Sequence, residues 1–556
     1  MGVRSGIGGV ATTTVLDLLA EAATGTGVCR FEPSGVEKSL GAMWQDAEQV
    51  ARWLRARTGT GGRIGAFLTN TENCPAVVIG TWLSGNDLVS LPYPGRGADL
   101  ESFIRQIELM CELSGVQLLL LDDAYRGLLP PMSVPTAAFG EAVAGAGSEA
   151  LPDLPTFSPA GAGAEAGGGG LVQFTSGSLG NPKGVVLTGQ ALAVNIIDIL
   201  DAIEVGPGDR AGSWLPLSHD MGFVGMFLAC LAANAPRVGG DMLVLQTPES
   251  FLADPASWLR LCATHGVTHT TGPNFAFELS VKAAPMLAGL DLSRLRVCIT
   301  GAERVKADTV ARFTETFAPM GLSPEVICPA YGMAEASLAV TISRPADVWR
   351  TSVRPGTETL AGGPVLDVGN GSLLERVDLR IVDDAGRPTD GVGDVQIRGA
   401  SLFSDYLGAE RRLTPEGWFP TRDVGYLADG ELFLVGRADE SIIVGGRNLY
   451  STDIEQAVRH DAVRAGCLAA LPTLDGYGLV AEPVRAASAD GDLTRLRAIC
   501  RELASDAARQ FGARPEFVGF VERGQLMKTP SGKLRRLSMV AALDAGELPL
   551  IASIGR

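Results

Sequence analysis

The stretch LVQFTSGSLGNPKGVV, residues 171–186, joins an apolar, strand-like run to a loop of small residues that a single lysine closes. Glycines let backbone N–H groups turn toward a polyanion, and the lysine adds a point charge beside them. The pattern predicts a loop that binds the phosphates of a nucleotide. The candidate phosphate-binding residues are Thr175, Ser176, Gly177, Ser178, Gly180 and Lys183.

The Walker A loop does not describe this stretch. That motif requires a Gly-Lys pair followed by Ser or Thr. Here Asn181 and Pro182 precede Lys183, and Gly184 follows it. The stretch therefore indicates a nucleotide-binding enzyme of another class.

Size, charge and cysteine content limit the class further. The chain has 556 residues, 46% of them hydrophobic, which allows several lobes with buried cores. Asp and Glu number 63 against 46 Lys and Arg, a net charge of −17 that disfavours nucleic acid as a partner. No run reaches the roughly 18 apolar residues of a membrane-spanning helix. The nine cysteines are scattered and never spaced Cys-x-x-Cys, so we expect reduced, buried thiols in a cytoplasmic protein.

Patterning along the chain predicts an α/β fold with several lobes. Helix-like runs alternate with short apolar runs over residues 44–150 and again over 171–345, which predicts two β/α layered subdomains. Residues 158–170 between them are almost all Ala and Gly, as in a flexible linker. Short strands and turns over about 360–435 predict a small β-barrel or antiparallel sheet, and residues 440–556 read as a compact α+β segment.

Further segments extend the pattern in a fixed order. They are WLPLSHDMG (214–222), GPNFAF (272–277), GAE (301–303), PAYGMAE (329–335), GWFPTRDVGY (417–426), GRADE (436–440) and KTPSGKLRR (528–536). Together with the phosphate loop, this collinear set resembles the adenylate-forming superfamily of acyl-CoA synthetases, peptide-synthetase adenylation domains, luciferases and fatty acyl-AMP ligases. The run PNFAFEL resembles the fatty acyl-AMP ligase branch in particular. The resemblance implies a large adenylation domain over residues 1–438, a small mobile C-terminal domain over 439–556, and ATP and Mg²⁺ as cofactors.

The resemblance also implies how the nucleotide is held. Glu335 would hold Mg²⁺, because a hard cation beside phosphates prefers carboxylate oxygen, although alone it also fits an acid at a helix N-terminus. Asp423 would accept hydrogen bonds from the ribose hydroxyls, although alone it also fits a turn. Arg437 would contact ribose or phosphate. The residues implied to surround adenine are Gly301, Ala302, Glu303, Ala330, Tyr331, Gly332 and Met333, with Tyr331 stacking on the base.

Three residues are implied to be catalytic, and one to be a hinge. His219 would line the meeting point of acyl group and ATP, and Lys183 and Lys533 would offset charge on the transferring phosphate. Alone, His219 also fits a buried structural histidine, and Lys533 a solvated basic tail. Asp439 would be the hinge about which the small domain rotates.

We therefore expect ATP-dependent activation of a hydrophobic carboxylic acid, fatty or bulky and polycyclic, to an acyl-adenylate with release of pyrophosphate. A thiol then takes the acyl group, in lipid or secondary metabolism such as antibiotic biosynthesis. The acceptor is either coenzyme A or the phosphopantetheine arm of an acyl carrier protein. The ligase branch carries an inserted segment after its Glu335 motif. Here Gly363 follows Glu335 by only 28 positions, which leaves no room for that insertion and therefore favours coenzyme A. A peptide-synthetase adenylation domain and a non-catalytic nucleotide-binding relative are the alternatives.

Four positions depart from the superfamily's usual residues. Ser218 stands where an aromatic often precedes the histidine, which predicts a wide acyl pocket. Leu179 replaces a small hydroxyl or an arginine in the phosphate loop. Arg422 stands where glycine is usual, which questions the local backbone geometry. Ala334 replaces the threonine common in CoA ligases and matches the acyl-AMP ligase branch.

Overall fold

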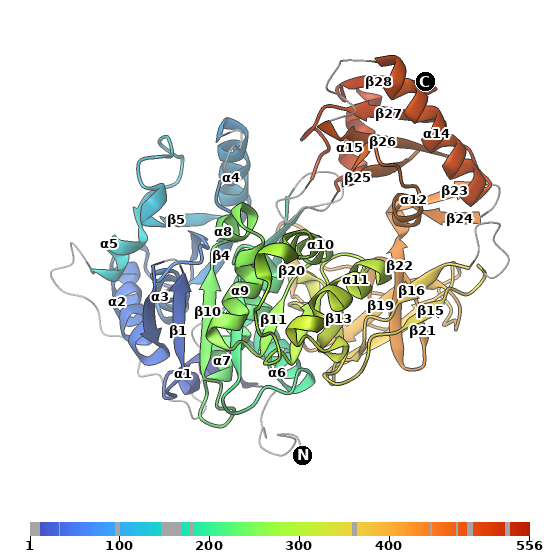
Figure 1. Cartoon of the computed structure of the whole chain (residues 1–556). Helices are drawn as coiled ribbons and strands as arrows, with labels where there is room; N and C mark the ends of the chain where they lie inside the picture. The colour runs from blue at the N-terminus through green and yellow to red at the C-terminus, as the bar shows by residue number, and fades with distance from the viewer. Residues whose placement is uncertain are drawn as a thin grey trace.

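The computed structural model of the chain describes residues 12–32, 34–94, 100–145, 169–176, 182–357, 364–444, 447–473, 476–485, 493–528 and 534–555. Within them lie a large N-terminal domain built on two big sheets and a small C-terminal α+β domain (Figure 1). This confirms the predicted fold class. The boundary at residues 438/439 remains a prediction.

The first big sheet has nine strands and is mostly parallel. Its central strands run parallel from β1 to β13, and β2, β14 and β17 add antiparallel edges. In order across the sheet, the strands are β17 (Ser372–Leu373), β14 (Ala339–Ile342), β13 (Ile327–Gly332), β12 (Val297–Thr300), β11 (His269–Thr271), β9 (Arg210–Ser213), β10 (Met242–Gln246), β1 (Val28–Glu32) and β2 (Val36–Ser39).

The second big sheet has seven strands, of which five neighbours are parallel, while β8 pairs antiparallel with β7 and β20 pairs antiparallel with β8 at the edge. It contains the strand of the predicted phosphate loop, β7, next to β4. In order, its strands are β20 (Asp405–Tyr406), β8 (Pro182–Leu187), β7 (Leu171–Ser176), β4 (Asp87–Leu91), β3 (Arg63–Phe67), β5 (Val116–Leu121) and β6 (Thr136–Ala138).

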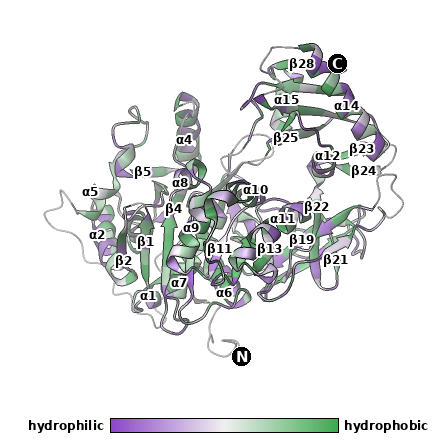
Figure 2. Cartoon of the chain, viewed as in Figure 1, coloured by the Kyte–Doolittle hydropathy of each residue, from purple (hydrophilic) through white to green (hydrophobic). Residues whose placement is uncertain are grey.

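Helices cover both sheets and form the main core between them. Helix α3 has all ten residues buried, and α2 begins at the Ser39 cap, whose hydroxyl accepts from the Ala42 N–H at 3.1 Å. Figure 2 shows hydrophobic residues concentrated on the central strands. The α-helices of the large domain are α1 (Val15–Ala22), α2 (Leu40–Thr58), α3 (Cys74–Leu83), α4 (Leu100–Ser114), α5 (Phe139–Val143), α6 (Gly189–Ala202), α7 (Ala229–Ala233), α8 (Pro248–Ala253), α9 (Ala256–His265), α10 (Asn274–Ala283) and α11 (Ala307–Phe317).

The predicted barrel-like region is a four-stranded antiparallel sheet with a two-stranded ribbon beside it. The sheet consists of β18 (Val377–Val382), β19 (Gly393–Gly399), β21 (Phe419–Ala428) and β22 (Glu431–Arg437). The ribbon pairs β15 (Thr351–Val353) with β16 (Leu366–Val368).

The small domain follows β22 and has its own four-stranded sheet and core. Strands β26 and β27 are parallel and α14 connects them, as a parallel crossover requires. The elements are β23 (Ser441–Val444), β24 (Arg447–Tyr450), α12 (Ser451–Ala457), β25 (Val463–Pro472), β26 (Tyr477–Pro483), α14 (Leu493–Phe511), β27 (Phe517–Val521), α15 (Arg536–Asp544) and β28 (Leu550–Gly555).

Two further expectations concern the cysteines, expected to be reduced and buried, and the helices, expected not to span a membrane. All nine cysteines are free, and only Cys230 is more than marginally accessible. Burial raises the pKa of the Cys262 thiol to about 12, so the thiol is inert. Among the residues described, none of the helices combines the length and apolarity that a bilayer crossing requires.

Candidate active site

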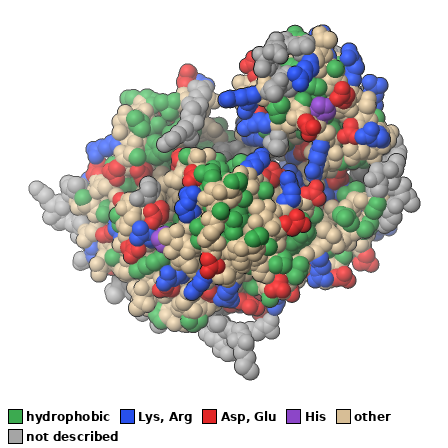
Figure 3. Space-filling view, in the orientation of Figure 1, with side chains coloured by type: hydrophobic (Ala, Val, Ile, Leu, Met, Phe, Trp, Pro, Cys, Tyr) green, Lys and Arg blue, Asp and Glu red, His purple; other side chains and the backbone are tan. Residues whose placement is uncertain are grey.

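A cleft of about 3070 Å³ lies between the large domain and the small domain. Figure 3 shows the hollow, with Lys and Arg side chains along its small-domain edge. Every predicted site residue whose side chain the structure describes lines this cleft: Thr175, Lys183, His219, Gly301, Ala302, Glu303, Ala330, Tyr331, Gly332, Met333, Glu335, Asp423, Arg437 and Asp439. Their individual roles remain predictions. The side chain of Ser176 and the whole of Gly177, Ser178, Leu179, Gly180 and Lys533 lie outside the described residues.

The predicted phosphate loop joins two antiparallel strands, β7 and β8, with Thr175 opposite Lys183. This hairpin differs from the strand–loop–helix arrangement of a Walker A loop, which agrees with the rejection of that motif. Strand β20 extends the sheet beyond β8 and places Tyr406 opposite Val185. The ammonium of Lys183 lies 5.6 Å from the centre of the Tyr406 ring. The lysine is thereby held at the edge of the cleft.

The candidate metal ligand Glu335 lies in a single 3-10 turn, η7 (Ala334–Ala336). The Tyr406 hydroxyl donates a hydrogen bond to Glu335 Oε1 at 2.8 Å. Burial raises the pKa of Glu335, and the Tyr406 hydrogen bond opposes that rise. Because η7 is one short turn, it offers little helix dipole for an acid to complement, and the metal-binding role of Glu335 stays a prediction.

The side chains around Glu335 suit a Mg²⁺ ion that binds together with the phosphates of a nucleotide. Within the described parts of the chain, no group of three or more His, Cys, Asp and Glu side chains is placed to hold a metal ion by itself. Mg²⁺ commonly uses one or two carboxylates and takes its other ligands from substrate phosphates and water. A single partly buried carboxylate in a cleft beside Lys183 meets that requirement.

The segments predicted to surround adenine meet at the carboxyl ends of β12 and β13, which are parallel neighbours. In open α/β sheets ligands bind at this end. A Cβ at position 332 would lie 1.9 Å from the Leu338 carbonyl oxygen, so only glycine fits there. Ala302 has φ = 66°, a left-handed conformation that costs a non-glycine residue energy and is concentrated at functional sites.

The ribose candidate Asp423 contacts residues from two sheets. The Tyr331 hydroxyl donates to Asp423 Oδ2 at 2.7 Å, and Arg437 donates to Oδ1 at 3.4 Å. Asp423 and Arg437 are directly paired across β21 and β22. Arg422, whose replacement of glycine questioned the local geometry, has φ = 67°. The arginine thus adopts the left-handed conformation that glycine takes more easily.

His219 lies two residues before the first residue of a π-helix, η3 (Met221–Leu228), whose N-cap is Asp220. Its Nδ1 lies 2.7 Å from Asp220 Oδ1, and the Met221 N–H points to the same nitrogen at 3.3 Å. π-Helical turns are rare and often occur at functional sites. The His219 side chain is 28% exposed and lines the cleft, which fits the site reading better than that of a buried structural histidine.

An apolar wall adjoins His219 in the same cleft. Met221, Leu252, Phe275 and Leu279 contribute to it. Phe275 packs edge-on against the buried Trp214, with 5.9 Å between ring centres. Phe275 belongs to the PNFAFEL run, so this run contributes an apolar side chain to the cleft.

Asp439 lies in the 3-10 turn η8 (Ala438–Glu440), between the last strand of the antiparallel sheet and β23 of the small domain. Arg437 Nε donates to Asp439 Oδ1 at 3.2 Å. The position is a connection between the two domains, which suits a hinge, although its role remains a prediction.

Two sets of residues at or near the cleft had no signal in the sequence. Tyr406 sits on a two-residue strand whose partner, β8, lies more than two hundred positions earlier. A buried network of Arg304, Arg354, Asp367 and Asp453 joins the two domains. Both depend on pairings between distant segments, which hydrophobic periodicity does not encode.

The fold and the cleft define the chain as an adenylate-forming enzyme. Its structure resembles one from a study of fatty acyl-adenylate ligases from E. coli and L. pneumophila, with a TM-score of 0.86 at 24% identity over 97% of this chain and 99% of that one. A long-chain-fatty-acid–AMP ligase, FadD26 of Mycobacterium marinum, is 34% identical over 67% of this chain and 70% of its own. A ligase designated Rv1013 from Mycobacterium tuberculosis is 32% identical over 93% of this chain and 96% of its own.

The family described as AMP-binding enzyme matches residues 27–407. The chain belongs to this family.

Proposed function

We propose that the chain is a fatty acyl-AMP ligase that passes its acyl group to the phosphopantetheine thiol of an acyl carrier protein. The observation that supports the proposal is that the phosphate, metal and ribose candidates line one cleft together with the apolar side chains of Met221, Leu252, Phe275 and Leu279. A triphosphate and a hydrophobic acid can therefore meet in one site. The similarity to a protein named as a fatty-acid–AMP ligase supports the choice of acid.

In the first half-reaction, a carboxylate oxygen of the acid attacks the α-phosphorus of ATP. The bond from that phosphorus to the bridging oxygen breaks, and pyrophosphate leaves. Lys183 and Lys533 offset negative charge on the transferring and departing oxygens. Mg²⁺, held by Glu335, would neutralise charge on the phosphates. Asp423 and Tyr331 hold the ribose and base so that the α-phosphorus lies near His219.

In the second half-reaction, the thiolate of the acceptor attacks the acyl carbon, the mixed anhydride breaks, and AMP leaves with the bonding electron pair. No cysteine of this chain takes part. The nine thiols are free and mostly buried, so a nucleophile must enter the cleft from outside. The thiol on a flexible phosphopantetheine arm meets this requirement.

The proposed acceptor, a carrier protein, differs from the one expected from the sequence. The sequence favoured coenzyme A because only 28 positions separate Glu335 from Gly363. The structure contains an ordered ribbon in and just after this interval, β15–β16, and Arg354 beside β15 contacts Asp453 of the small domain. Part of this short interval is thus a structured contact with the small domain. The similarity to a named acyl-AMP ligase supports the carrier protein instead.

A two-stage assay tests the proposal. The enzyme and ATP are first given fatty, aryl and polycyclic acids, and pyrophosphate release is measured. Coenzyme A or a phosphopantetheinylated carrier protein is then added, and the thioester is identified by mass. We expect pyrophosphate with fatty acids and acylation of the carrier, with apo-carrier as the control. Equal or faster formation of acyl-CoA would support the coenzyme A alternative, and no pyrophosphate with any acid would support a non-catalytic relative.

A further inference from the structure

Four charged side chains form a buried interdomain network between the large and small domains: Arg304, Arg354, Asp367 and Asp453. Arg354 donates two hydrogen bonds to Asp367, at 2.8 and 2.9 Å, and two to Asp453, at 2.6 and 2.9 Å. Arg304 donates to the same two carboxylates. No side chain of the four is more than 10% exposed. Two positive and two negative charges make the network neutral.

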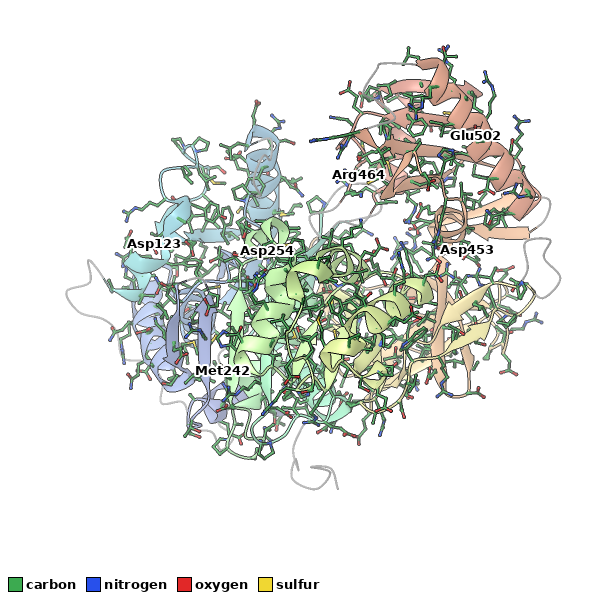
Figure 4. All side chains as sticks on the ribbon, viewed as in Figure 1. Asp123, Met242, Asp254, Asp453, Arg464 and Glu502 are labelled. Carbon is green, nitrogen blue, oxygen red and sulfur yellow. The ribbon has the colours of Figure 1, made fainter. Side chains whose placement is uncertain are left out.

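The network joins three parts of the fold. Arg304 follows the end of β12, Arg354 directly follows β15, Asp367 lies on β16, and Asp453 lies on α12 of the small domain. Figure 4 shows Asp453 at the junction between the domains. Burial acts to lower the pKa of Arg354, but the hydrogen bonds to Asp367 and Asp453 raise it overall. Although burial opposes it, the two arginines hold the pKa of Asp453 below its usual range, so the network stays charged at neutral pH.

Arg304 also connects this network to the predicted adenine site. It directly follows Gly301–Glu303, and its backbone carbonyl accepts a hydrogen bond from Asn274 Nδ2 at 2.6 Å. Glu303 Oε1 accepts from the Phe275 N–H at 3.4 Å. A movement of the Arg304 side chain would therefore act on a loop that is fixed at both the nucleotide segment and the apolar wall.

The described residues that flank Lys533 in the sequence belong to the small domain and lie at the cleft. Lys528 on one side of that lysine and Leu534 to Arg536 on the other line the cleft. This orientation suits the first half-reaction, in which Lys533 is proposed to act on the phosphates. Rotation to a second orientation would pull Asp453 away from both arginines and leave buried charges without partners, which is strongly unfavourable.

We propose that the Arg304–Asp453 contact is a latch that holds the small domain in the orientation for adenylation, with Arg304 a positioning residue that couples this orientation to the nucleotide loop. The inference rests on the proposed two-step function. Loss of the latch then slows adenylation without slowing transfer from an acyl-adenylate that is already formed. A role in folding alone would slow both steps together.

The double substitution Arg304→Met with Asp453→Asn tests the latch. It removes one positive and one negative charge and leaves the Arg354–Asp367 pair, which lies wholly in the large domain, as a neutral unit. We expect acid-dependent ATP–pyrophosphate exchange to fall about tenfold, within the usual range of coupling between two states. Transfer from preformed acyl-adenylate to the carrier should be unchanged or faster. Small-angle X-ray scattering should show a larger radius of gyration than that of the wild-type chain.

A matched control breaks another ion pair between the same domains. Arg459 donates to Asp308 on α11 at 3.0 Å, and both side chains are 65% exposed. Exposed pairs contribute little, so Arg459→Gln should leave both half-reactions and the scattering curve unchanged.

The outcomes separate the latch from the proposed function. If the wild-type enzyme releases no pyrophosphate with any acid, the proposed function is refuted. The latch is then tested by comparing the radius of gyration of the wild type with that of the double variant. Active wild-type enzyme, with a double variant that keeps the wild-type ratio of half-reaction rates and the same radius of gyration, refutes the latch. Where the double variant does not fold, Arg304→Lys replaces it, because lysine keeps the charge and loses the planar fork that reaches two carboxylates. A wild-type ratio for that variant also refutes the latch.

Discussion

The Tyr331 hydroxyl donates a hydrogen bond to Asp423 Oδ2 over 2.7 Å, which ties the nine-stranded sheet to the antiparallel sheet at the floor of the cleft. Arg437 donates to the other carboxylate oxygen. The residue predicted to stack on adenine therefore also orients the residue predicted to bind ribose. A nucleotide would meet these two side chains as one prearranged unit, which lowers the cost of ordering them on binding.

The substitution Tyr331→Phe isolates this hydrogen bond, because it keeps the aromatic ring. We expect the KM for ATP to rise about fivefold, the equivalent of roughly 1 kcal/mol for one hydrogen bond, with little change in kcat. Steady-state kinetics with varied ATP measures the effect. Tyr426→Phe is the matched control, since Tyr426 is buried and bonded to the Ser352 carbonyl, away from the cleft residues. An unchanged KM in the Tyr331 variant would show that the contact does not order the nucleotide site.

The same contact predicts a pH dependence. Burial raises the pKa of the Tyr331 phenol well above its usual value, and the neighbouring Asp423 raises it further. A group whose pKa is raised by folding contributes its full stabilisation below the unfolded value, about 10 for tyrosine, and loses it only as the pH rises through the folded pKa. The ratio of KM values for ATP between Tyr331→Phe and wild type should therefore stay constant from about pH 7 to 9.5. A ratio that collapses toward one within this range would contradict the prediction.

Arg422 offers a test of backbone strain beside the ribose site. Its φ of 67° is left-handed, and its side chain is 63% exposed with a 3.9 Å ion pair to Asp439. Arg422→Ala and Arg422→Gly both remove the side chain, but only glycine relieves the steric cost of about 1–2 kcal/mol. The greater freedom of glycine in the unfolded chain offsets about 0.4–1 kcal/mol of this gain. The glycine variant should thus have a free energy of unfolding roughly 0.5–1 kcal/mol above that of the alanine variant in urea titrations. A less stable glycine variant would mean that the cleft imposes no strain here.

The parts of the site that the sequence predicted are those whose position follows from local pattern. Gly301 follows the apolar run of β12, and Ala330 to Gly332 close the apolar run of β13. Apolar runs of this length become buried parallel strands, whose carboxyl ends share one edge. The sequence therefore predicts that these candidate residues lie close together, even though it does not give the order of the strands.

Features that depend on distant pairing could not be predicted in this way. Tyr406 reaches Glu335 because β20 pairs with β8, and no local signal marks so short a strand. Asp453 reads in the sequence as an ordinary acid in the first turn of a helix, yet 149 positions separate it from its partner Arg304. The charge pattern gives neither the register of the edge strand nor the orientation of the small domain, because tertiary packing determines both.

The terminal lysine gives a prediction about catalysis rather than binding. Lys533→Ala should lower the rate of adenylation by about two orders of magnitude, as the loss of one preorganised donor does, while ATP still binds. Calorimetry measures binding, and pyrophosphate release measures the rate. Lys528→Ala is the control in the same segment, because the Lys528 ammonium donates to the Gly466 carbonyl at 3.0 Å and so has a structural partner. Equal losses in the two variants would assign the effect to the segment and not to Lys533.

The width of the acyl pocket depends on Ser218, which lines the cleft next to His219. Its backbone is fixed, since Gln173 Nε2 donates to the Ser218 carbonyl at 2.8 Å, so a larger side chain at 218 must occupy cleft volume. Ser218→Phe should lower kcat/KM for bulky polycyclic acids more than tenfold relative to straight-chain acids. Ser218→Ala removes the hydroxyl without adding volume and should leave the preference unchanged. If the phenylalanine variant accepts both kinds of acid in the wild-type ratio, the acyl chain does not pass Ser218, and the apolar wall around Phe275 alone selects the acid.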